Sequence, residues 1–565
     1  MTRSIRLRPW QKEALERFRA SVSPDFLAVA TPGAGKTTFA LTAALGELAA
    51  ADGPRRLIVV APTAHLKLQW ASAAAGFGVH LEPSWSAADG ALPPDMHGIV
   101  TTYQQVATSA RVLAGLSRDA MVIFDELHHA GDDRAWGAAV TAAFTPARRR
   151  LALSGTPFRS DTRAIPFVTY ALDEARPDYE YGYGAALGDG RVVRPVYFPR
   201  TGGHMEWSAP DGATLSATFD DALPQQLANQ RLRTALSVEG DWLPTVLRSA
   251  HERLTDLRRT HPEAGGLVIA IDHDHARAIA EQLAWRFGVR PTVALSDDPG
   301  ASARIARFAA STDPWLVAVR MVSEGVDIPR LRVGVYATTT TTELFFRQAV
   351  GRLVRWTRGV PNQRAYFYIP DDPRLRARAF QIAEVRRHSL RRDRPEAAAD
   401  DPAALDAIPA TGREAGDDQL SLFAVISATA TDTAIHGTGL DPHDEATEGL
   451  VDEGDDPDDP GLVVPLPVLT GAGQAVGTGG AGGDGPPLTR RQQKDRLREA
   501  NAELARALVH RTGWPHAKVN AELNRMAGVA RITEATIEQL QRRRTAAERW
   551  YQRLTPGAGR VRSSG

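Results

Sequence analysis

The sequence from Phe26 to Thr38, FLAVATPGAGKTT, combines the residue types of a loop that binds phosphate groups. Its apolar start, Phe26 to Ala30, predicts a buried parallel strand, which is followed by a glycine-rich turn and the first turn of a helix. Backbone N–H groups of such a turn can close around a phosphate, while a lysine and a hydroxyl reach the outer phosphates and Mg²⁺. The residues that we expect to bind a nucleotide in this way are Thr31, Pro32, Gly33, Ala34, Gly35, Lys36, Thr37 and Thr38.

One position departs from the strict loop pattern G-x-x-x-x-G-K-[ST], because its first residue is Ala30 rather than glycine. The alternative is a glycine-rich turn that arose by chance. The chain uses arginine far more often than lysine, yet Lys36 stands where a compact ammonium suits phosphate better than a planar guanidinium. We therefore interpret the stretch as a nucleotide site in which Thr37 also binds Mg²⁺.

A second apolar run, Met121 to Phe124, leads directly into Asp125, Glu126, Leu127 and His128. A carboxylate at the end of a strand, downstream of a phosphate loop, predicts that Asp125 holds Mg²⁺ and that Glu126 polarises the attacking water. The alternative for a lone Asp-Glu pair is a solvated loop. The histidines next to it do not follow a metal-binding pattern such as H-E-x-x-H.

Alternating apolar strands and amphipathic helices must position these groups, which predicts an α/β fold with parallel sheets whose ligands lie at the carboxyl ends of the strands. The pattern divides into a first domain at 1–187 and a second at 188–395. The strands that we expect are Phe26–Ala30, Leu57–Ala61, Gly98–Thr102, Met121–Phe124 and Arg150–Ser154 in the first, and Pro195–Phe198, Gly266–Ile271, Thr292–Leu295, Trp315–Val319, Val333–Ala337 and Ala365–Ile369 in the second.

Gln348, Arg352 and Arg355 recur at the spacing i, i+4 and i+7, which places them on one face of a predicted helix. Aimed across a cleft at Lys36, they would contact the outermost phosphate and neutralise charge in the transition state. The alternative is a surface stripe of arginines in a chain that is rich in them.

This ordered series resembles the superfamily 2 helicases and translocases of the DEAD/DEAH type, and most of all the helicase subunits of type I and type III restriction enzymes. The resemblance covers about residues 1–395. The segments that carry it are Leu7–Lys12, Ala30–Thr37, Ala61–Thr63, Thr101–Tyr103, Asp125–His128, Ser154–Pro157, Ser323–Pro329 and Gln348–Arg355.

The resemblance implies two tandem RecA-like domains, ATP and Mg²⁺ as cofactors, and an ATP-dependent DNA helicase or double-stranded DNA translocase. It implies that Gln11 binds the adenine, that Gly325 and Asp327 approach the nucleotide, and that Gln348, Arg352 and Arg355 act in catalysis. It further implies coupling roles for His128, Ser154 and Thr156 and contacts to nucleic-acid phosphates for Pro62, Thr63, Thr102 and Tyr103.

The net charge of zero conceals opposite charges along the chain. Residues 396–487 hold 19 acidic groups and one basic group, whereas residues 488–565 hold 17 basic and seven acidic groups. A basic segment of this kind predicts binding to a polyanion.

The chain has no cysteine, which excludes disulfides and thiolate metal sites. We also expect no membrane span, no signal peptide and a cytoplasmic location.

Residues 396–487 are rich in Asp, Ala, Gly and Pro, which predicts a disordered acidic linker. Within it, Gln419, Leu420, Leu422 and Phe423 resemble the short segment with which bacterial proteins dock on the replication sliding clamp. The alternative is an apolar clip that folds back on the second domain.

Residues 488–556 predict a basic helical domain with helices at 490–511, 515–526 and 533–554. We expect it to bind DNA, most densely through Arg542, Arg543 and Arg544; the alternative is a bundle that contacts the motor domains.

No nuclease pattern is present, so cutting would need a separate chain. Two functions remain beside the motor: an ATP-gated DNA-binding scaffold, and the motor subunit of a restriction or phage-defence complex. Whether the chain unwinds DNA or only translocates is left open.

Overall fold

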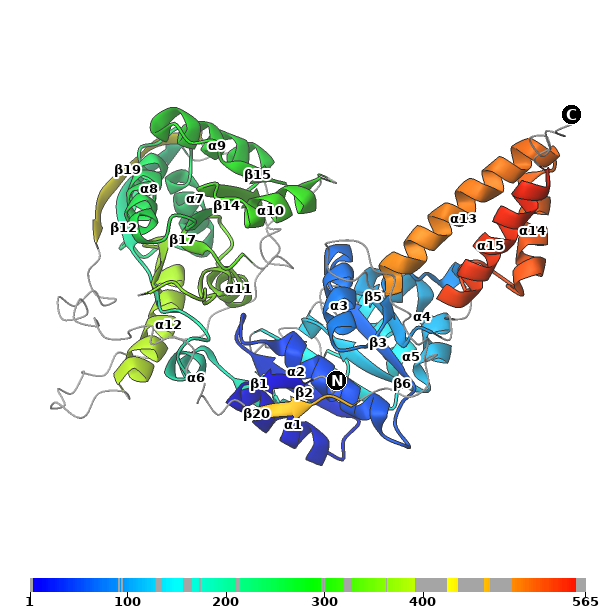
Figure 1. Cartoon of the computed structure of the whole chain (residues 1–565). Coiled ribbons are helices and arrows are strands. Elements are labelled where there is room, and N and C mark those ends of the chain that lie inside the picture. The colour runs from blue at the N-terminus through cyan, green and yellow to red at the C-terminus, as the bar shows by residue number, and fades with distance from the viewer. Residues whose placement is uncertain are drawn as a thin grey trace, which may run out of the picture.

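The computed structural model describes residues 4–89, 92, 95–128, 134–155, 165–171, 174–208, 213–295, 298, 300–319, 328–361, 363–391, 424–434, 462–467 and 490–554. They form two α/β domains and an arm of three helices that projects from the first domain (Figure 1). The predicted fold class of two tandem parallel-sheet domains followed by helices is confirmed. Helix α6 (Tyr183–Gly188) runs across the boundary that we placed at residue 187, so that boundary stays a prediction.

Seven parallel strands form the sheet of the first domain, in the order β10-β2-β7-β6-β3-β5-β4. Its five longer strands are continuous apolar runs, as strands covered by helices on both faces must be. The sequence predicts these five and misses the two short edge strands. The bounds are β2 Asp25–Ala30, β3 Arg56–Ala61, β4 Leu81–Glu82, β5 Gly98–Thr102, β6 Ala120–Phe124, β7 Arg149–Ser154 and β10 Tyr179–Tyr181.

Helices cover this sheet on both faces and create two apolar cores, one with α1, α2 and α3 and one with α4 and α5. Two threonines define where functional helices begin: the Thr63 hydroxyl accepts from Leu66 N, and the Thr102 hydroxyl accepts from Gln105 N. The bounds are α1 Pro9–Ala20, α2 Lys36–Ala49, α3 Ala64–Gly76, α4 Tyr103–Ser117 and α5 Arg134–Phe144, with a 3₁₀ turn at Ala87–Asp89 and a small β8 Tyr170–Ala171 and β9 Glu174–Ala175 hairpin.

The second domain contains a nine-stranded sheet whose parallel part follows the order β18-β17-β14-β16-β15, with β11 beside β18. Each expected strand of this domain is present. The bounds of the strands are β11 Val196–Tyr197, β12 Arg200–Ser208, β13 Thr214–Thr218, β14 Gly265–Ala270, β15 Thr292–Ala294, β16 Trp315–Val319, β17 Leu331–Ala337, β18 Ala365–Pro370 and β19 Ala424–Ala434, and those of the helices are α7 Gln225–Ala235, α8 Trp242–Thr260, α9 His273–Phe287, α10 Ala301–Ala310, α11 Glu343–Leu353 and α12 Pro373–Arg391.

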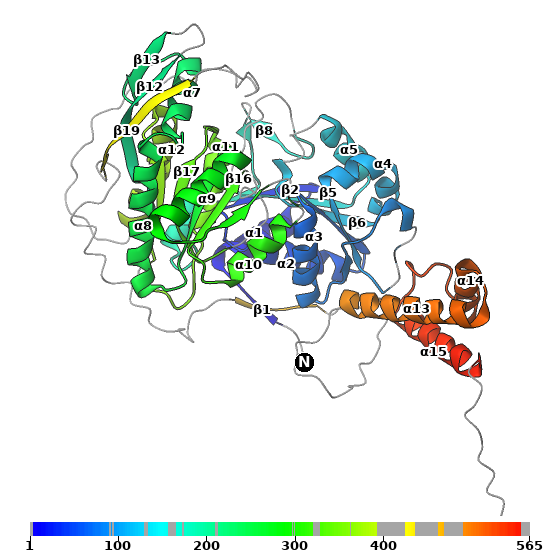
Figure 2. The ribbon, with the colours of Figure 1, turned by 90° about the horizontal axis from the view of Figure 1, so that it is seen from above.

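An antiparallel extension of this sheet corrects two expectations. The strands that we expected in this domain do not include β12 and β13, which form an antiparallel pair, and β12 alternates between buried and less buried residues. Strand β19, inside the linker that we expected to be disordered, pairs with the other edge of β12 (Figure 2). An open strand edge is satisfied by pairing, and residues 424–434 are rich in Ala, Thr, Val and Ile, residue types that suit a strand.

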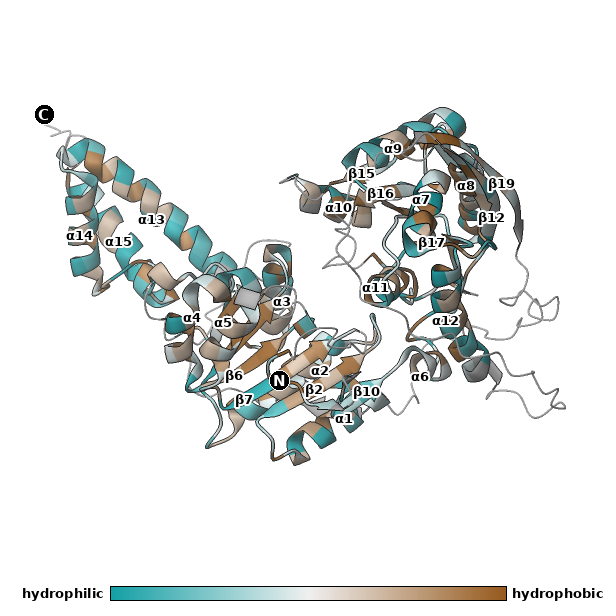
Figure 3. Ribbon diagram, turned by 180° about the vertical axis from the view of Figure 1, so that it is seen from behind, coloured by the Kyte–Doolittle hydropathy of each residue, from teal (hydrophilic) through white to brown (hydrophobic). Residues whose placement is uncertain are grey.

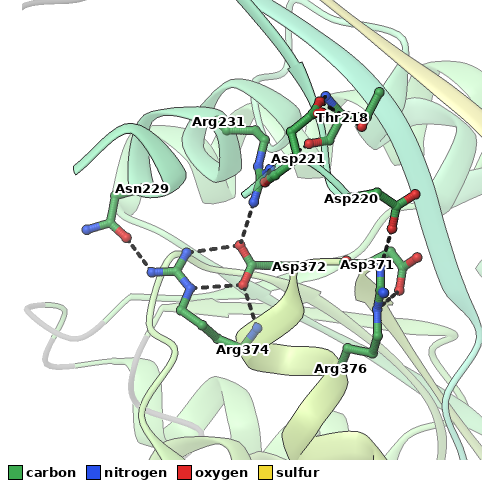
Figure 4. Close-up of polar contacts among 9 residues, drawn as sticks. All are labelled: Thr218, Asp220, Asp221, Asn229, Arg231, Asp371, Asp372, Arg374 and Arg376. Atoms are coloured by element: carbon green, nitrogen blue, oxygen red, sulfur yellow. Dashed lines mark hydrogen bonds and ion pairs between the residues drawn. The ribbon is translucent and has the colours of Figure 1, made fainter. Parts of the chain in front are cut away.

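A polar network joins this extension to α12 (Figure 4). The carboxylate of Asp372 is fully buried, accepts two hydrogen bonds from the Arg374 guanidinium at 2.9 and 3.0 Å, and lies 4.0 Å from Arg231. Arg231 in turn donates to the carbonyl oxygens of Thr218 and Asp221 at the end of β13. Arg374 and Arg231 therefore fix the extension with charge-assisted hydrogen bonds.

A second segment of the expected linker, β20 (Leu462–Pro465), pairs antiparallel with the N-terminal strand β1 (Ser4–Leu7). It is a short apolar run at the edge of the first domain, where pairing satisfies the backbone groups of both strands. The prediction of disorder over 396–487 is therefore wrong for this segment as it is for β19.

The arm consists of α13 (Arg490–Thr512), α14 (His516–Ala527) and α15 (Ile537–Leu554), which confirms the three predicted helices. The third helix begins four residues later than expected, because Thr536 rather than Thr533 caps it: Gln539 N donates to Thr536 Oγ1 at 3.1 Å. Apolar and polar residues alternate along the arm, whereas strands such as β2 and β6 are mostly apolar (Figure 3). None of the helices in the described ranges is both long and apolar enough to cross a membrane.

Candidate active site

The phosphate loop connects β2 to α2 through two glycines with backbone angles that side chains rarely adopt. Gly33 has φ 87° and Gly35 has φ 94°, and Gly35 is the residue before α2 begins at Lys36. A Cβ atom on Gly35 would lie 2.7 Å from Gln11 Nε2. The loop can therefore take this shape only with glycine at both positions.

Three side chains from the segment before and within α1 hold carbonyl groups of the loop. Arg8 and Trp10 Nε1 donate to the carbonyl oxygen of Ala34 at 3.0 and 3.1 Å, and Gln11 Nε2 donates to Gly35 O at 2.9 Å. Gln11 is 3% exposed. Its amide supports the loop in this structure, and its contact with adenine stays a prediction.

Lys36, Glu126 and the backbone of Gly155 meet at the carboxyl ends of β2, β6 and β7. Lys36 Nζ lies 2.9 Å from Glu126 Oε1, and Gly155 N donates to Glu126 Oε2 at 2.9 Å. A Cβ on Gly155 would lie 3.0 Å from Lys36 Nζ, so a glycine leaves room for the ammonium. Glu126 has φ 48°, in the left-handed region, which a glutamate adopts only where its surroundings hold it there.

The electrostatics of this cluster keep Glu126 ionised. Burial alone would raise the pKa of Glu126, but the Lys36 ammonium, His128 and the hydrogen bonds from Lys36 and Gly155 lower that pKa well below its usual range. An ionised carboxylate can accept a proton or orient water, which is the role that the sequence predicts for Glu126.

Asp125 has the surroundings of a metal-binding carboxylate. Its Oδ2 accepts a hydrogen bond from Trp70 Nε1 at 2.8 Å, and its backbone oxygen accepts from the Tyr103 hydroxyl at 3.0 Å. Oxygen ligands such as the Asp125 carboxylate and the Thr37 hydroxyl suit Mg²⁺, and a donor behind a carboxylate orients it toward a metal. The residues therefore fit the expected ion.

The second domain reaches this cluster through α11. Gln348 Nε2 lies 3.0 Å from His128 Nε2, and His128 Nδ1 lies 3.6 Å from Glu126 Oε2. A Cβ on Gly351 would lie 2.6 Å from Pro32 Cγ, so α11 packs directly on the phosphate loop. The structure thus brings Gln348 to the same site as Lys36 and Glu126, although they come from different domains.

Arg355 does not lie on the helix face that the residue spacing predicts. Helix α11 ends at Leu353, and Arg355 lies beyond it in a β-bridge with Val193. Its side chain still reaches the phosphate loop, because a Cβ on Gly33 would lie 2.9 Å from Arg355 Cδ. Arg355 therefore arrives at the site by a turn after the helix rather than by helical periodicity, and Arg352 is in the last turn of α11.

The remaining predicted residues divide into three groups. Ser154 is buried at the end of β7, and Pro62, Thr63 and Thr102 lie where α3 and α4 begin. Tyr103 is 0% exposed and points into the core toward Asp125, so the expectation that it touches nucleic acid is wrong for this structure. Residues that lie outside the described ranges are Thr156, Gly325, Asp327, Gln419, Leu420, Leu422 and Phe423.

Trp70 and Arg8 belong to the site and are missed by the sequence reasoning. Arg8 directly precedes α1, and Trp70 lies seven residues after Thr63, which is two helical turns along the same face. The periodicity of α3 could have indicated that a residue at this spacing points to the same side as its N-terminus.

The comparisons with known proteins concern both the first domain and the whole chain. The family described as "Type III restriction enzyme, res subunit" matches residues 4–159, which confirms the resemblance to superfamily 2 proteins of restriction systems. A fragment of a protein described as an HsdR subunit of a type I restriction enzyme, from Vibrio vulnificus YJ016, aligns with 66% of this chain and 65% of its own at 17% identity and a TM-score of 0.47.

Two relatives align over nearly the full length. The uncharacterized protein ML1624 of Mycobacterium leprae (strain TN) is 42% identical over 560 residues, 95% of this chain and 92% of its own. The uncharacterized protein Rv2917 of Mycobacterium tuberculosis (strain ATCC 25618 / H37Rv) is 41% identical over 560 residues, 95% of this chain and 91% of its own. The chain belongs to the same family as these mycobacterial proteins, and its first domain carries the helicase-type core related to restriction-enzyme res subunits.

Proposed function

We propose that this chain is an ATP-hydrolysing motor of superfamily 2 that moves along DNA. The observation that carries the proposal is the composite site, in which Lys36 and Glu126 of the first domain face Gln348 and Arg355 of the second. A site divided between two domains couples the state of the nucleotide to the relative position of the domains.

Each side chain has one task in this proposal. Lys36 neutralises phosphate oxygens, Glu126 orients the attacking water, and Arg352 and Arg355 stabilise the charge of the transition state. Mg²⁺, held by Thr37 and Asp125, supplies charge neutralisation at the outer phosphates when it is bound. Lys36 now pairs with Glu126, so ATP must draw the ammonium to its phosphates and thereby release the carboxylate for water.

Other predicted roles belong to the same proposal. Gln11 would read the adenine, Asp327 would contact the ribose, and Gly325 would allow close approach of the backbone. The coupling residues would be His128, Ser154 and Thr156. Among these residues, His128 has the contacts that best support a coupling role, because it touches both Glu126 and Gln348 and so lies between the two domains.

Nucleic-acid binding is proposed for the starts of α3 and α4. These starts are neighbours, because Ala61 at the end of β3 pairs with Thr102 at the end of β5. Two adjacent helix N-termini offer N–H groups to successive backbone phosphates, with Pro62, Thr63 and Thr102 at the contact. The relation to restriction-enzyme res subunits favours DNA over RNA as the track.

Partner proteins are part of the same proposal. A motor subunit that works with a separate nuclease fits the restriction-type family match of residues 4–159. Docking of Gln419, Leu420, Leu422 and Phe423 on a sliding clamp stays a prediction. The strand that begins directly after them at Ala424 pairs with β12, which favours the alternative of a segment folded back on the second domain.

The test is the steady-state ATPase rate without nucleic acid and with single-stranded DNA, duplex DNA or RNA, measured beside Glu126→Gln. We expect DNA to raise the ATPase rate of the wild-type protein. Glu126→Gln should lower the DNA-stimulated rate by about 10²- to 10⁴-fold, which is the usual contribution of a general base. The preferred strand form separates unwinding from duplex translocation. Negligible turnover with ATP still bound would replace the motor with the ATP-gated scaffold.

A further inference from the structure

We infer that Trp70 and Tyr103 are positioning residues that tie the carboxylate and the backbone carbonyl of Asp125 to the two helices proposed to hold the nucleic-acid backbone. The inference rests on the proposed function and names the route by which nucleic acid would stimulate hydrolysis. Trp70 belongs to α3 and Tyr103 opens α4, so each of these helices sends one donor to the same residue at the end of β6.

Trp70 makes the direct link to the carboxylate. Its indole N–H donates to Asp125 Oδ2 at 2.8 Å, and the ring is 3% exposed, packed in the apolar core beneath α3. An indole has one donor and no acceptor, and it pivots only with the helix that carries it. A hydrogen bond to one carboxylate oxygen fixes the plane of the group and thereby the direction in which the other oxygen points.

Tyr103 fixes the backbone of the same residue. Its hydroxyl donates to Asp125 O at 3.0 Å, and the side chain is fully buried. The amide of Asp125 is already bound, because Asp125 N donates to Val60 O at 2.9 Å. Asp125 is therefore held at its amide by the neighbouring strand, at its carbonyl by α4 and at its side chain by α3.

The two helices are also joined to one another near their N-termini. Lys67 Nζ donates to Gln105 Oε1 at 2.8 Å, and Lys67 is 8% exposed. The same Gln105 oxygen accepts from Thr102 N, while Gln105 N donates to the Thr102 hydroxyl. A displacement at the start of either helix is therefore shared, because a buried polar bridge resists separate movement.

These contacts connect the two sites along one helix face. Lys67 and Trp70 follow Thr63, the residue before α3, at the spacings i+4 and i+7. A backbone phosphate bound at Thr63 would therefore contact the face of α3 from which Trp70 reaches Asp125. A shift of α3 would turn the Asp125 carboxylate, which is the proposed magnesium ligand. Nucleic acid bound at α3 would thus change the affinity for Mg²⁺ without contacting the ion.

The test replaces only the donors. Trp70→Phe and Tyr103→Phe remove the N–H and the O–H while leaving aromatic rings in place, and benzothienylalanine at position 70 keeps the full ring size without the N–H. Trp85→Phe is the matched control, because Trp85 is a buried tryptophan of the same domain that belongs to the other core. Two quantities are measured: the Mg²⁺ dependence of binding of a fluorescent non-hydrolysable ATP analogue, and the factor by which DNA stimulates hydrolysis.

We expect both Trp70 replacements to weaken the apparent Mg²⁺ affinity of nucleotide binding by about 10- to 100-fold, the range for lost outer contacts of metal ligands. The DNA stimulation factor should fall with it, while DNA affinity and thermal stability stay near those of Trp85→Phe. Wild-type Mg²⁺ dependence and stimulation in the benzothienylalanine variant would overturn the inference. Absence of stimulation in the wild-type protein would instead overturn the proposed function, and the Mg²⁺ dependence of binding would still decide the role of Trp70.

Discussion

The side chains of Glu126 and Lys36 form an ion pair in this structure, so each neutralises the charge of the other. The two groups are within hydrogen-bond distance, and the carboxylate is further held by Gly155 N. A lysine that is shared between a carboxylate and a phosphate can serve only one of them at a time. In the proposed mechanism, ATP would therefore not only fill the site but also free the Glu126 carboxylate to activate water.

Arg355 provides the sharpest residue-scale prediction, because it comes from the second domain and lies against Gly33. We expect Arg355→Ala to lower kcat by about 10³-fold or more, as loss of an arginine that stabilises the phosphoryl transition state does. ATP affinity should change far less, because the binding contacts of the first domain remain. Steady-state and binding measurements separate these two quantities.

The matched control is Arg358→Ala, which removes an exposed arginine three residues further along the same segment. It should retain kcat within about twofold if position rather than net charge matters. Equal losses in the two variants would mean that Arg355 contributes only to the general positive potential of the turn.

His97 makes stability depend on pH. Burial, followed by the charge of Arg490, lowers the pKa of His97 from 6.5 to about 4. Below pH 6.5 the unfolded chain takes up a proton that the folded protein does not, so stability should fall as the pH decreases from 6.5 to about 4. Thermal unfolding over this range should show a weaker pH dependence for His97→Gln than for wild type. The exposed His510→Gln serves as control and should follow the wild-type curve.

At the scale of elements, the arm is organised around a buried arginine. Arg543 is 1% exposed and donates to the amide oxygens of Asn501, Asn520 and Asn524 at 3.1, 2.6 and 2.8 Å. The asparagines come from α13 and α14, so one guanidinium holds all three helices together. The expectation that Arg543 contacts DNA is therefore wrong, since its donors face inward; Arg542 and Arg544 remain exposed.

Replacement of this arginine tests the organisation of the arm. Arg543→Met should destabilise the arm by about 1–3 kcal/mol, because the buried amide of Asn501 loses its partner, whereas the half-buried amides of Asn520 and Asn524 can bind water instead. Hydrogen exchange along α13–α15 should rise while exchange in the two α/β domains stays unchanged. Arg542→Gln, on the exposed face beside it, should leave exchange as in wild type.

The elements show which parts of the fold follow from sequence pattern. Parallel strands such as β3 and β6 are continuous apolar runs between polar ends, so local pattern suffices to predict them. β12 contains two glycines and mixes polar with apolar residues, and its partner β19 is more than 200 residues away. Pairing over such a separation is decided by tertiary contacts. Arg355 illustrates the same limit, since periodicity cannot indicate that α11 ends two residues before it.

At the scale of the whole molecule, the chain after α12 returns to both α/β domains. β19 pairs with the second domain, β20 pairs with β1 of the first, and the arm docks on the first domain near β4. β1 directly precedes Arg8, which donates to the phosphate loop. In the proposed mechanism, any movement of one domain relative to the other would have to preserve or break these two strand pairings.

The carboxylate of Asp95 makes the central contacts between the arm and the first domain, beside an ion pair of Arg498 with Glu82. Asp95 Oδ1 lies 2.7 Å from Lys494 Nζ, whose side chain is 0% exposed, and Asp95 Oδ2 accepts from Ile537 N at the start of α15. Asp95→Asn would leave the Lys494 ammonium buried without its counter-charge, and loss of one member of a buried pair costs about 3–5 kcal/mol. We expect the arm to detach from the first domain while its own helices stay folded.

This variant decides whether the arm binds DNA and whether it must be docked to do so. Deletion of residues 488–565 removes 17 basic and seven acidic groups and should flatten the salt dependence of DNA affinity if the arm touches phosphates. An arm that needs its docked position should give Asp95→Asn an intermediate slope, whereas a tethered arm that binds independently should give the wild-type slope. Asp52→Asn makes the same charge change at an exposed site of the first domain and controls for net charge. Identical slopes for all four proteins would show that the arm makes no contacts with DNA phosphates.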